Sequence, residues 1–136
     1  MPPQLPFFVY GTLRPGGRNH TRHLAGRCTG ARAATLEDTA LHRGPGYPYA
    51  LPDTGRAVHG EVVTVHPALY GQVLADLDRL EDCTADGTGE YVRERLAVRL
   101  DDGSTAAAWV YLAGPRVAAR LRAAPDLVAS GDWHRR

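Results

Sequence analysis

Two alternating segments joined by a short turn constrain the fold of this chain more than any other feature. Residues 91–100 alternate between the two faces of a predicted strand, with Val92, Leu96, Val98 and Leu100 on one face and Tyr91, Arg93, Arg95 and Arg99 on the other. The sequence Asp-Asp-Gly-Ser at 101–104 is typical of a hairpin turn, and residues 105–112 supply the partner strand. This hairpin predicts an antiparallel sheet with one buried face.

Further strands are expected earlier in the chain. Residues 5–10 form a short apolar and aromatic run that Gly11 ends, which indicates a central strand followed by a tight loop. Residues 27–41 alternate weakly and are expected to supply one or two strands, and the β-branched run at 58–66 predicts another. Residues 44–53 are rich in proline and glycine and are expected to form a loop that carries Tyr47 and Tyr49.

One amphipathic helix is predicted before the hairpin. Pro67 suits the first position of a helix. Apolar residues then recur at helical spacing, at Leu69, Val73, Leu74, Leu77 and Leu80. The pattern ends at Glu81 and Asp82, where a loop with two glycines begins at residue 83.

Strands outnumber helices in this prediction. A second, short helix is expected over residues 116–124, before Pro125. With a hairpin as the clearest connection, the expected fold class is α+β: a small, mostly antiparallel sheet that is curled toward a barrel and accompanied by a few helices.

Length and composition indicate one globular domain over residues 1–136. Hydrophobic residues make up 43% and charged residues 23% of the chain, a balance that argues against disorder. The 16 basic residues, all arginine, nearly cancel the 15 acidic ones, so nucleic acid is not an expected partner. The sequence shows no secretion signal and no apolar run of about 20 residues, so the prediction is a cytoplasmic protein without a membrane partner. A monomer is the default expectation, and a dimer is possible.

The glycine-containing loop at 11–17 can present consecutive backbone N–H groups to an anion or oxyanion. It is not a Walker A loop, because Gly17 and Arg18 stand where that motif needs Lys and Ser or Thr. It also lacks the dinucleotide pattern GxGxxG. Two interpretations stay open from the residues alone: a turn that ends the strand, or a loop that contacts a ligand.

Glu81 is a candidate acid/base residue because it follows the apolar stripe of the helix. A carboxyl beside apolar surface has a raised pKa, and a glutamate whose pKa moves from about 4.3 toward about 6–7 can accept and return a proton. The alternative is a solvated carboxylate at a helix end. Asp76 and Asp78 on the same helix are expected to be solvated or to cap it.

Other chemistries are weakly supported. His20, His23 and Cys28 do not form a recognised zinc motif, and surface histidines are the favoured interpretation, so no metal and no cofactor are predicted. Cys83 lacks a visible group that would lower its pKa and make it a nucleophile. Cys28 and Cys83 are expected to be reduced thiols. The serine hydrolase motif GxSxG is absent from the sequence.

Five short motifs together resemble the γ-glutamylcyclotransferase-like family over residues 7 to about 133. They are Phe8-Val-Tyr-Gly-Thr-Leu-Arg14, Val58-His-Gly-Glu61, Leu77-Asp-Arg-Leu-Glu-Asp82, Tyr91-Val-Arg93 and Trp109-Val-Tyr111. The resemblance implies a small mixed barrel, with the glutamyl end of the substrate held by Tyr10, Gly11, Thr12 and Leu13, and with Glu81 as the catalytic carboxylate. Tyr91 and Tyr111 match aromatic positions near the cavity. Arg93 could equally be a structural ion-pair partner. Asp82 departs from the family, in which glycine is frequent.

The activity that this resemblance implies is intramolecular cyclisation of a γ-glutamyl amide to 5-oxoproline with release of a free amine, a transferase or lyase type of reaction without metal. The leaving amine is not predicted: an amino acid, a glutathione-like peptide, the ε-amine of lysine and a biosynthetic intermediate all fit. Residues 42–56 and 83–90 are expected to line that side. The alternatives are a module that binds a small carboxylate without turnover, or a scaffold with a vestigial cavity.

Overall fold

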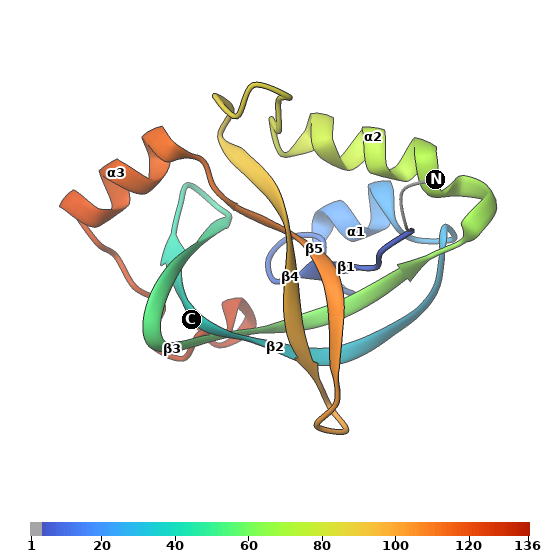
Figure 1. The fold of residues 1–136 in the computed structure, drawn as a ribbon, viewed down its shortest axis with the longest axis horizontal. Coiled ribbons are helices and arrows are strands. Elements are labelled where there is room, and N and C mark those ends of the chain that lie inside the picture. The colour runs from blue at the N-terminus through green and yellow to red at the C-terminus, as the bar shows by residue number, and fades with distance from the viewer. Residues whose placement is uncertain (1–3) are drawn as a thin grey trace.

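The computed structural model describes residues 4–136, and five strands close into a barrel in it (Figure 1). The strands are β1 (Phe7–Val9), β2 (Cys28–Arg43), β3 (Pro48–Val65), β4 (Tyr91–Leu100) and β5 (Thr105–Ala113). Around the barrel they follow the order β1-β3-β2-β4-β5, in which β1 and β5 are parallel and the other pairs are antiparallel. The helices are α1 (Arg18–His23), α2 (Tyr70–Leu80) and α3 (Pro115–Ala123), with short 3-10 segments η1 (Pro67–Leu69) and η2 (Trp133–Arg135). The α+β class and the curled, mostly antiparallel sheet are thereby confirmed.

The predicted hairpin forms, with β4 over the predicted residues 91–100 and β5 one residue longer than the predicted 105–112. β4 and β5 pair from Tyr91 opposite Ala113 to Arg99 opposite Thr105. The apolar face of β4 packs into the core, where Val98 is buried and Val92 lies against it. Figure 1 shows this hairpin standing across the long β2–β3 pair, which curls around it. The weakly alternating segment forms the single strand β2, which begins at Cys28.

The loop predicted over residues 44–53 is wrong. β3 starts at Pro48 and pairs with β2 from Arg43 opposite Pro48 to Thr39 opposite Pro52, so only residues 44–47 form the turn. The prediction failed because it weighed proline and glycine content alone. Pro48 is the first residue of its strand, a position that needs no N–H donor. Tyr49 beside it is 1% exposed, and its burial holds this segment against the barrel.

The buried apolar side chains form two clusters, an inner cluster within the barrel and an outer cluster between the sheet and the helices. The inner cluster takes side chains from every strand and includes Phe8, Leu36, Val58, Val62, Val98 and Val110. The outer cluster joins Phe7 and Val63 of the sheet to Val73 and Leu77 of α2. Because successive residues of β1 point to opposite faces, Phe8 belongs to the inner cluster while Phe7 supports α2. The outer cluster therefore fixes α2, whose C-terminal end carries Glu81.

The apolar stripe of α2 is narrower than predicted. Val73 and Leu77 are fully buried, whereas Leu69 is 36% exposed and Leu80 is 37% exposed. Leu69 lies in η1, before the helix, and Leu80 is the last helical residue. Pro67 is the first residue of η1, whose N-terminus is capped by the His66 ring as it accepts a hydrogen bond from the Ala68 N–H.

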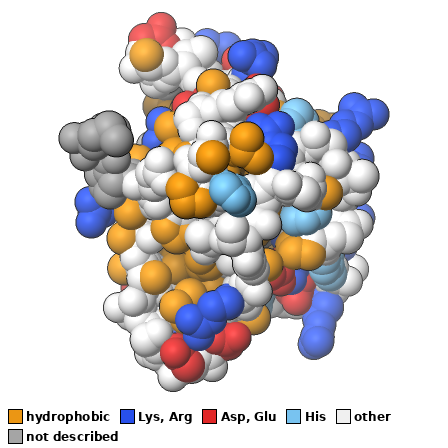
Figure 2. All heavy atoms as spheres, turned by 90° about the vertical axis from the view of Figure 1, so that its right-hand side faces the viewer, with side chains coloured by type: hydrophobic (Ala, Val, Ile, Leu, Met, Phe, Trp, Pro, Cys, Tyr) orange, Lys and Arg blue, Asp and Glu red, His pale blue; other side chains and the backbone are white. Residues whose placement is uncertain are grey.

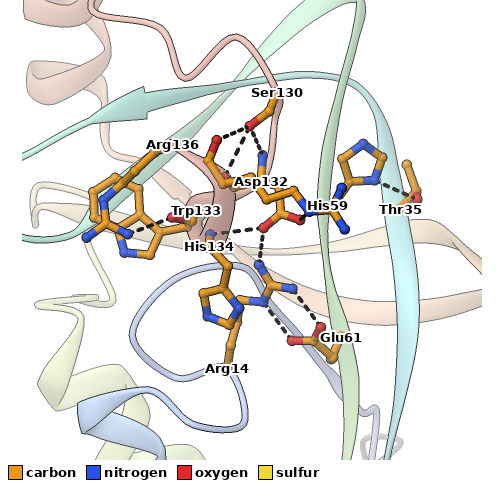
Figure 3. A network of polar contacts seen from close by, with 10 residues as sticks. Arg14, Thr35, His59, Glu61, Ser130, Asp132, Trp133, His134 and Arg136 are labelled. Atoms are coloured by element: carbon orange, nitrogen blue, oxygen red, sulfur yellow. Dashed lines mark hydrogen bonds and ion pairs between the residues drawn. The ribbon is translucent and has the colours of Figure 1, made fainter.

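An arginine in the loop after β1 ties three segments together (Figure 3). The Arg14 side chain is 8% exposed and donates from Nε and Nη2 to Glu61 on β3, at 2.7 and 2.8 Å. Its Nη1 donates to Asp132 in the C-terminal segment at 2.6 Å. Asp132 also accepts a hydrogen bond from the His134 N–H and thereby caps the N-terminus of η2. These contacts hold the loop that contains Gly11, Thr12 and Leu13.

The surface carries mixed charge. On the face drawn in Figure 2, hydrophobic side chains lie among scattered arginines, histidines and carboxylates, and neither sign of charge gathers into one patch there. None of the helices in residues 4–136 has the length and apolar character that a membrane crossing requires.

Candidate active site

A cavity of about 220 Å³ lies between the loop after β1 and the C-terminal end of α2. It is lined by all seven residues that the sequence analysis singled out, namely Tyr10, Gly11, Thr12, Leu13, Glu81, Tyr91 and Tyr111. Residues 42–56 contribute Tyr47 and Pro48, and residues 83–90 contribute Glu90. The fold therefore brings to one place segments that are up to a hundred residues apart in the sequence.

The loop after β1 presents a row of free backbone donors. A tight turn is closed by the Arg14 N–H, which donates to the Gly11 carbonyl at 3.1 Å. The Thr12 carbonyl points away from the row and accepts the N–H groups of Asn19 and His20 at the start of α1. Within residues 4–136, the N–H groups of Gly11, Thr12 and Leu13 donate to no other group. Consecutive free N–H groups beside a cavity form an anion or oxyanion site.

The absence of a side chain at Gly11 is a steric requirement of this loop. A Cβ atom there would lie 2.7 Å from Cδ of Pro48, which lines the same cavity. The pyrrolidine ring of Pro48 is fixed on β3 and cannot rotate away. A larger residue at 11 would therefore displace the donor row.

Glu81 is positioned by the way in which α2 ends. Its N–H closes the helix on the Leu77 carbonyl at 2.9 Å, and the Cys83 N–H then donates to the Asp78 carbonyl at 2.8 Å. Asp82 between them has φ +50°, the left-handed conformation that usually favours glycine at this position of a helix end. The Asp82 carboxylate accepts the Glu90 N–H at 3.1 Å, which ties the loop at 83–90 back to the helix. Glycine is frequent at the position of Asp82 in the family that the sequence resembles. The left-handed backbone conformation at this position explains that preference.

The Glu81 carboxyl group has no compensating partner. Within residues 4–136 it makes neither a hydrogen bond nor an ion pair, and the residue is half-buried. Burial raises the pKa of Glu81 from 4.5 to about 7, and the negative charge of Glu90 in the same cavity adds to the shift. A carboxyl with this pKa can both take and return a proton near neutral pH.

The three tyrosines of the site contribute their rings, because each hydroxyl already has a protein partner. Tyr91 donates to the Pro48 carbonyl at 2.7 Å, Tyr111 donates to Asp78 at 2.6 Å, and Tyr10 donates to the Tyr111 carbonyl. Burial raises the pKa of all three phenols well above the usual value. They form walls of the cavity and are not proton donors to a ligand in this arrangement.

The prediction that Asp78 is solvated or caps the helix is wrong. Asp78 accepts hydrogen bonds from Arg93, at 2.9 and 3.3 Å, as well as from Tyr111. The Arg93 guanidinium also lies 4.2 Å from the ring centroid of Trp109. Arg93 is thus the structural ion-pair partner that the sequence left as one option. The sequence could not show this pairing because it depends on β4 and β5 crossing beside α2.

Several lining residues were not singled out by the sequence. Arg18 and Asn19 come from α1, and Glu90 stands directly before β4. The Asn19 amide donates to the Thr12 hydroxyl at 2.7 Å, which braces the donor loop. A usable signal existed for Glu90: it is the acidic neighbour of Tyr91, at a strand start predicted to approach the site.

The weaker candidates do not assemble into a site. The His20 ring is 3.0 Å from the Leu13 carbonyl, and the Cys28 thiol donates to the Leu24 carbonyl. In the part of the chain that the structure describes, no three His, Cys, Asp or Glu residues lie close enough to hold a metal ion. Both cysteines are free, and burial raises the pKa of the Cys83 thiol, which makes it a poorer nucleophile.

Comparison with known proteins identifies a family to which nearly the whole chain is similar. Residues 7–135 match the family described as gamma-glutamyl cyclotransferase, AIG2-like. A protein of Vibrio cholerae provisionally named gamma-glutamylcyclotransferase is 35% identical over 129 residues, 95% of each chain. The gamma-L-glutamyl-butirosin B gamma-glutamyl cyclotransferase of Niallia circulans is 29% identical over 106 residues, which cover 77% of this chain and 64% of that protein. The crystal structure of an AIG2-like protein of Mus musculus is similar with a TM-score of 0.61 and 30% identity, over 82% of this chain and 80% of the mouse chain.

Proposed function

The chain belongs to the gamma-glutamyl cyclotransferase, AIG2-like family, and we propose that it cyclises a γ-glutamyl amide to 5-oxoproline and releases a free amine, with Glu81 as the acid/base residue. The observation that carries this proposal is that an unpaired carboxyl group and a loop with free N–H donors line the same cavity. The first suits proton transfer, and the second suits an anionic group or an oxyanion.

The proposed reaction requires the protein to position the substrate and to transfer protons. A γ-glutamyl amide carries its own nucleophile, the α-amine, at a distance that closes a five-membered ring on the γ-carbonyl carbon. Holding the chain in its folded conformation removes much of the entropic barrier. The tyrosine walls and the fixed loop after β1 are suited to hold such a conformation.

Glu81 can carry the protons of the whole reaction. Its carboxylate first accepts a proton from the α-ammonium, which frees the amine to form the new C–N bond. Glu81 then donates that proton to the departing nitrogen as the amide C–N bond breaks, and it takes up the second proton from the ring nitrogen. The last proton passes to the released amine. Glu81 returns to its ionised form, so no metal or organic cofactor is needed for the balance.

The donor row at Gly11, Thr12 and Leu13 has two candidate tasks in this reaction. It can hold the α-carboxylate of the glutamyl group, or it can stabilise the oxygen that becomes negative when the amine attacks. One well-aimed donor in an oxyanion site contributes about 3–4 kcal/mol to the transition state. Either task requires the turn geometry that Gly11 permits.

Replacement of Glu81 by glutamine tests the proposal. Glu81→Gln keeps the size of the side chain but cannot accept a proton, so release of 5-oxoproline from γ-glutamyl amides is expected to fall about 10²- to 10⁴-fold. Glu94→Gln, which removes an exposed carboxylate from β4, is the matched control and is expected to retain the rate. Undiminished turnover by Glu81→Gln excludes the acid/base assignment. Ligand binding without turnover by the unmodified protein supports the non-catalytic binding module instead.

The proposal includes a cytoplasmic location and no nucleic acid or membrane partner, with a monomer as the default state and a dimer as the alternative. The identity of the leaving amine follows from a screen of γ-glutamyl compounds, in which amino acids, peptides and lysine ε-amines serve as leaving groups.

A further inference from the structure

Glu90 is held in the cavity by its backbone and by two tyrosines. Its N–H donates to the Asp82 carboxylate at 3.1 Å, and its carbonyl accepts the Gly114 N–H at 2.8 Å. Its side chain accepts hydrogen bonds from the hydroxyls of Tyr47, at 2.9 Å, and Tyr49. A surface carboxylate at the start of a strand does not need four such contacts, so the side chain is positioned.

The two tyrosine hydroxyls leave half of the carboxylate free. Both donate to Oε1 of Glu90, and Oε2 has no partner among residues 4–136. The Tyr49 ring stacks on Tyr91 at 5.0 Å between centroids, and Tyr91 is fixed by its hydrogen bond to the Pro48 carbonyl. One oxygen is therefore anchored by two tyrosines, of which Tyr47 lines the cavity, while the other remains available to a ligand.

The charges around the cavity indicate which ligand group fits Oε2. The carboxylates that line it are Glu81 and Glu90, and neither forms an ion pair with a described residue. The other groups that can titrate nearby are phenols, at Tyr10, Tyr47, Tyr49, Tyr91 and Tyr111. Arg18, at the start of α1, is the single arginine among the described lining residues. Glu90 thus offers an oxygen that has neither a hydrogen-bond partner nor an ion pair among the described residues, and a cationic group of a ligand fits it best.

We propose that Glu90 is the residue that binds the α-ammonium group of the substrate through Oε2 and presents one of its N–H bonds to Glu81. This inference rests on the proposed cyclisation and goes beyond it, because it assigns recognition of the ammonium to a second carboxylate. The two carboxylates divide the work: Glu90 binds the cation, and Glu81 takes its proton. The charge of Glu90 also contributes to the raised pKa of Glu81, which makes Glu81 a stronger base.

A binding experiment without turnover tests the ammonium assignment separately from the reaction. In a Glu81→Gln background, calorimetry compares γ-glutamyl methylamide with N-methylglutaramate, the same molecule without its α-amine. A hydrogen bond to a charged group contributes about 1.5–3 kcal/mol, so the amine-bearing ligand is expected to bind about 10- to 100-fold more tightly. Addition of Glu90→Gln is expected to abolish this preference. Equal preference with and without Glu90 overturns the proposal, and this comparison stays readable even if Glu81 proves not to be catalytic.

The pH dependence of kcat/KM distinguishes an electrostatic role of Glu90 from a purely structural one, because a structural role does not shift it. Glu90→Gln keeps a carbonyl oxygen that can accept both phenol hydrogen bonds, but it removes the charge. With Glu81 intact, Glu90→Gln is therefore expected to shift the acidic limb of kcat/KM to lower pH, because the neighbouring negative charge that raises the pKa of Glu81 is lost. Glu94→Gln is the charge-matched control on β4. An unmoved limb in the folded Glu90→Gln variant contradicts the proposal.

A third variant covers the case in which Glu90→Gln does not fold. Glu90→Asp retains the charge with a shorter side chain, and it is expected to retain a clear preference for the amine-bearing ligand in the Glu81→Gln background. Thermal unfolding of each variant is recorded first. Loss of the preference in a folded Glu90→Asp variant, at unchanged affinity for N-methylglutaramate, counts against recognition by charge.

Discussion

The loop after β1 contributes both to the cavity and to the Arg14 network, but the carboxylates of these two regions differ in their partners. Residues 11–13 of this loop line the cavity, and their N–H groups have no acceptor among the described residues. Arg14 of the same loop points into the network with Glu61 and Asp132 (Figure 3). In the network, Glu61 and Asp132 each accept hydrogen bonds from a buried guanidinium. In the cavity, Glu81 has no partner among the described residues. The contrast separates a carboxylate that fixes structure from one that is kept available for chemistry.

The pKa values follow this difference. For Asp132, burial opposes ionisation, but the hydrogen bonds from Arg14 and from the His134 N–H outweigh it and lower the pKa. For Glu81, burial is opposed by nothing, and the pKa rises to about 7. A shift of that size corresponds to about 3 kcal/mol by which the fold disfavours the ionised carboxyl at neutral pH. The ionised form of Glu81 is therefore destabilised in the cavity, whereas the ionised form of Asp132 is stabilised by its hydrogen bonds.

Loss of Arg14 is expected to have the largest effect, and it acts on stability. Arg14→Met leaves Glu61 and Asp132 without their common cation, and breaking a buried pair in this way costs about 3–5 kcal/mol. Arg43→Met is the control, because its partner Asp126 is 67% exposed and such pairs contribute about 1 kcal/mol or less. Urea-induced unfolding measures both. Equal losses of stability in the two variants contradict a special structural role for the contacts of Arg14 with Glu61 and Asp132.

A methyl group at Gly11 is expected to act on activity more than on folding. Gly11→Ala brings a Cβ to within 2.7 Å of Pro48, so the donor row must move. One misplaced donor corresponds to about 3 kcal/mol, or about a hundredfold in kcat/KM. Gly71→Ala in α2 is the control, since no atom lies within 4 Å of the added Cβ. Retention of wild-type kcat/KM by Gly11→Ala shows that the row does not serve the reaction.

The smallest expected effect is the pH dependence of stability that Glu81 causes. The folded protein keeps a proton on Glu81 up to about pH 7, whereas the unfolded chain releases it near pH 4.5. Between these values the folded state binds more protons, so stability decreases as the pH rises. Glu81→Gln lacks this term and is expected to gain about 1–3 kcal/mol over wild type at pH 8, with little difference at pH 4. A gain that is constant with pH rules out this origin.

Local patterns predicted most of the fold. Alternation gave the limits of β4, and the position of Pro67 together with the spacing of Val73 and Leu77 gave the helix. Prediction failed where pairing with a distant strand overrides local composition. Residues 48–53 are proline-rich, yet β2 holds them in the barrel, and Asp78 looked solvated although Arg93 covers it.

The sequence predicted part of the candidate site. The glycine loop and the glutamate at the helix end are each local features, and the family resemblance joined them. The hydrogen bonds of Tyr47 and Tyr49 to Glu90 could not be predicted from the sequence, because they depend on how the turn at 44–47 lies against the start of β4. Nor does any local pattern show that Arg14 points away from the cavity while its neighbours face it.

Direct titration of the Glu81 carboxyl group tests the central contrast. The side-chain carboxyl carbons are followed by ¹³C NMR from pH 3 to pH 9, and the Glu81 signal is assigned by its loss in Glu81→Gln. A midpoint near 7 is predicted, because burial and the charge of Glu90 raise the pKa. A midpoint near 4.5 means that water or a protein partner stabilises the carboxylate, and it contradicts the assignment of Glu81 as the base of this cavity.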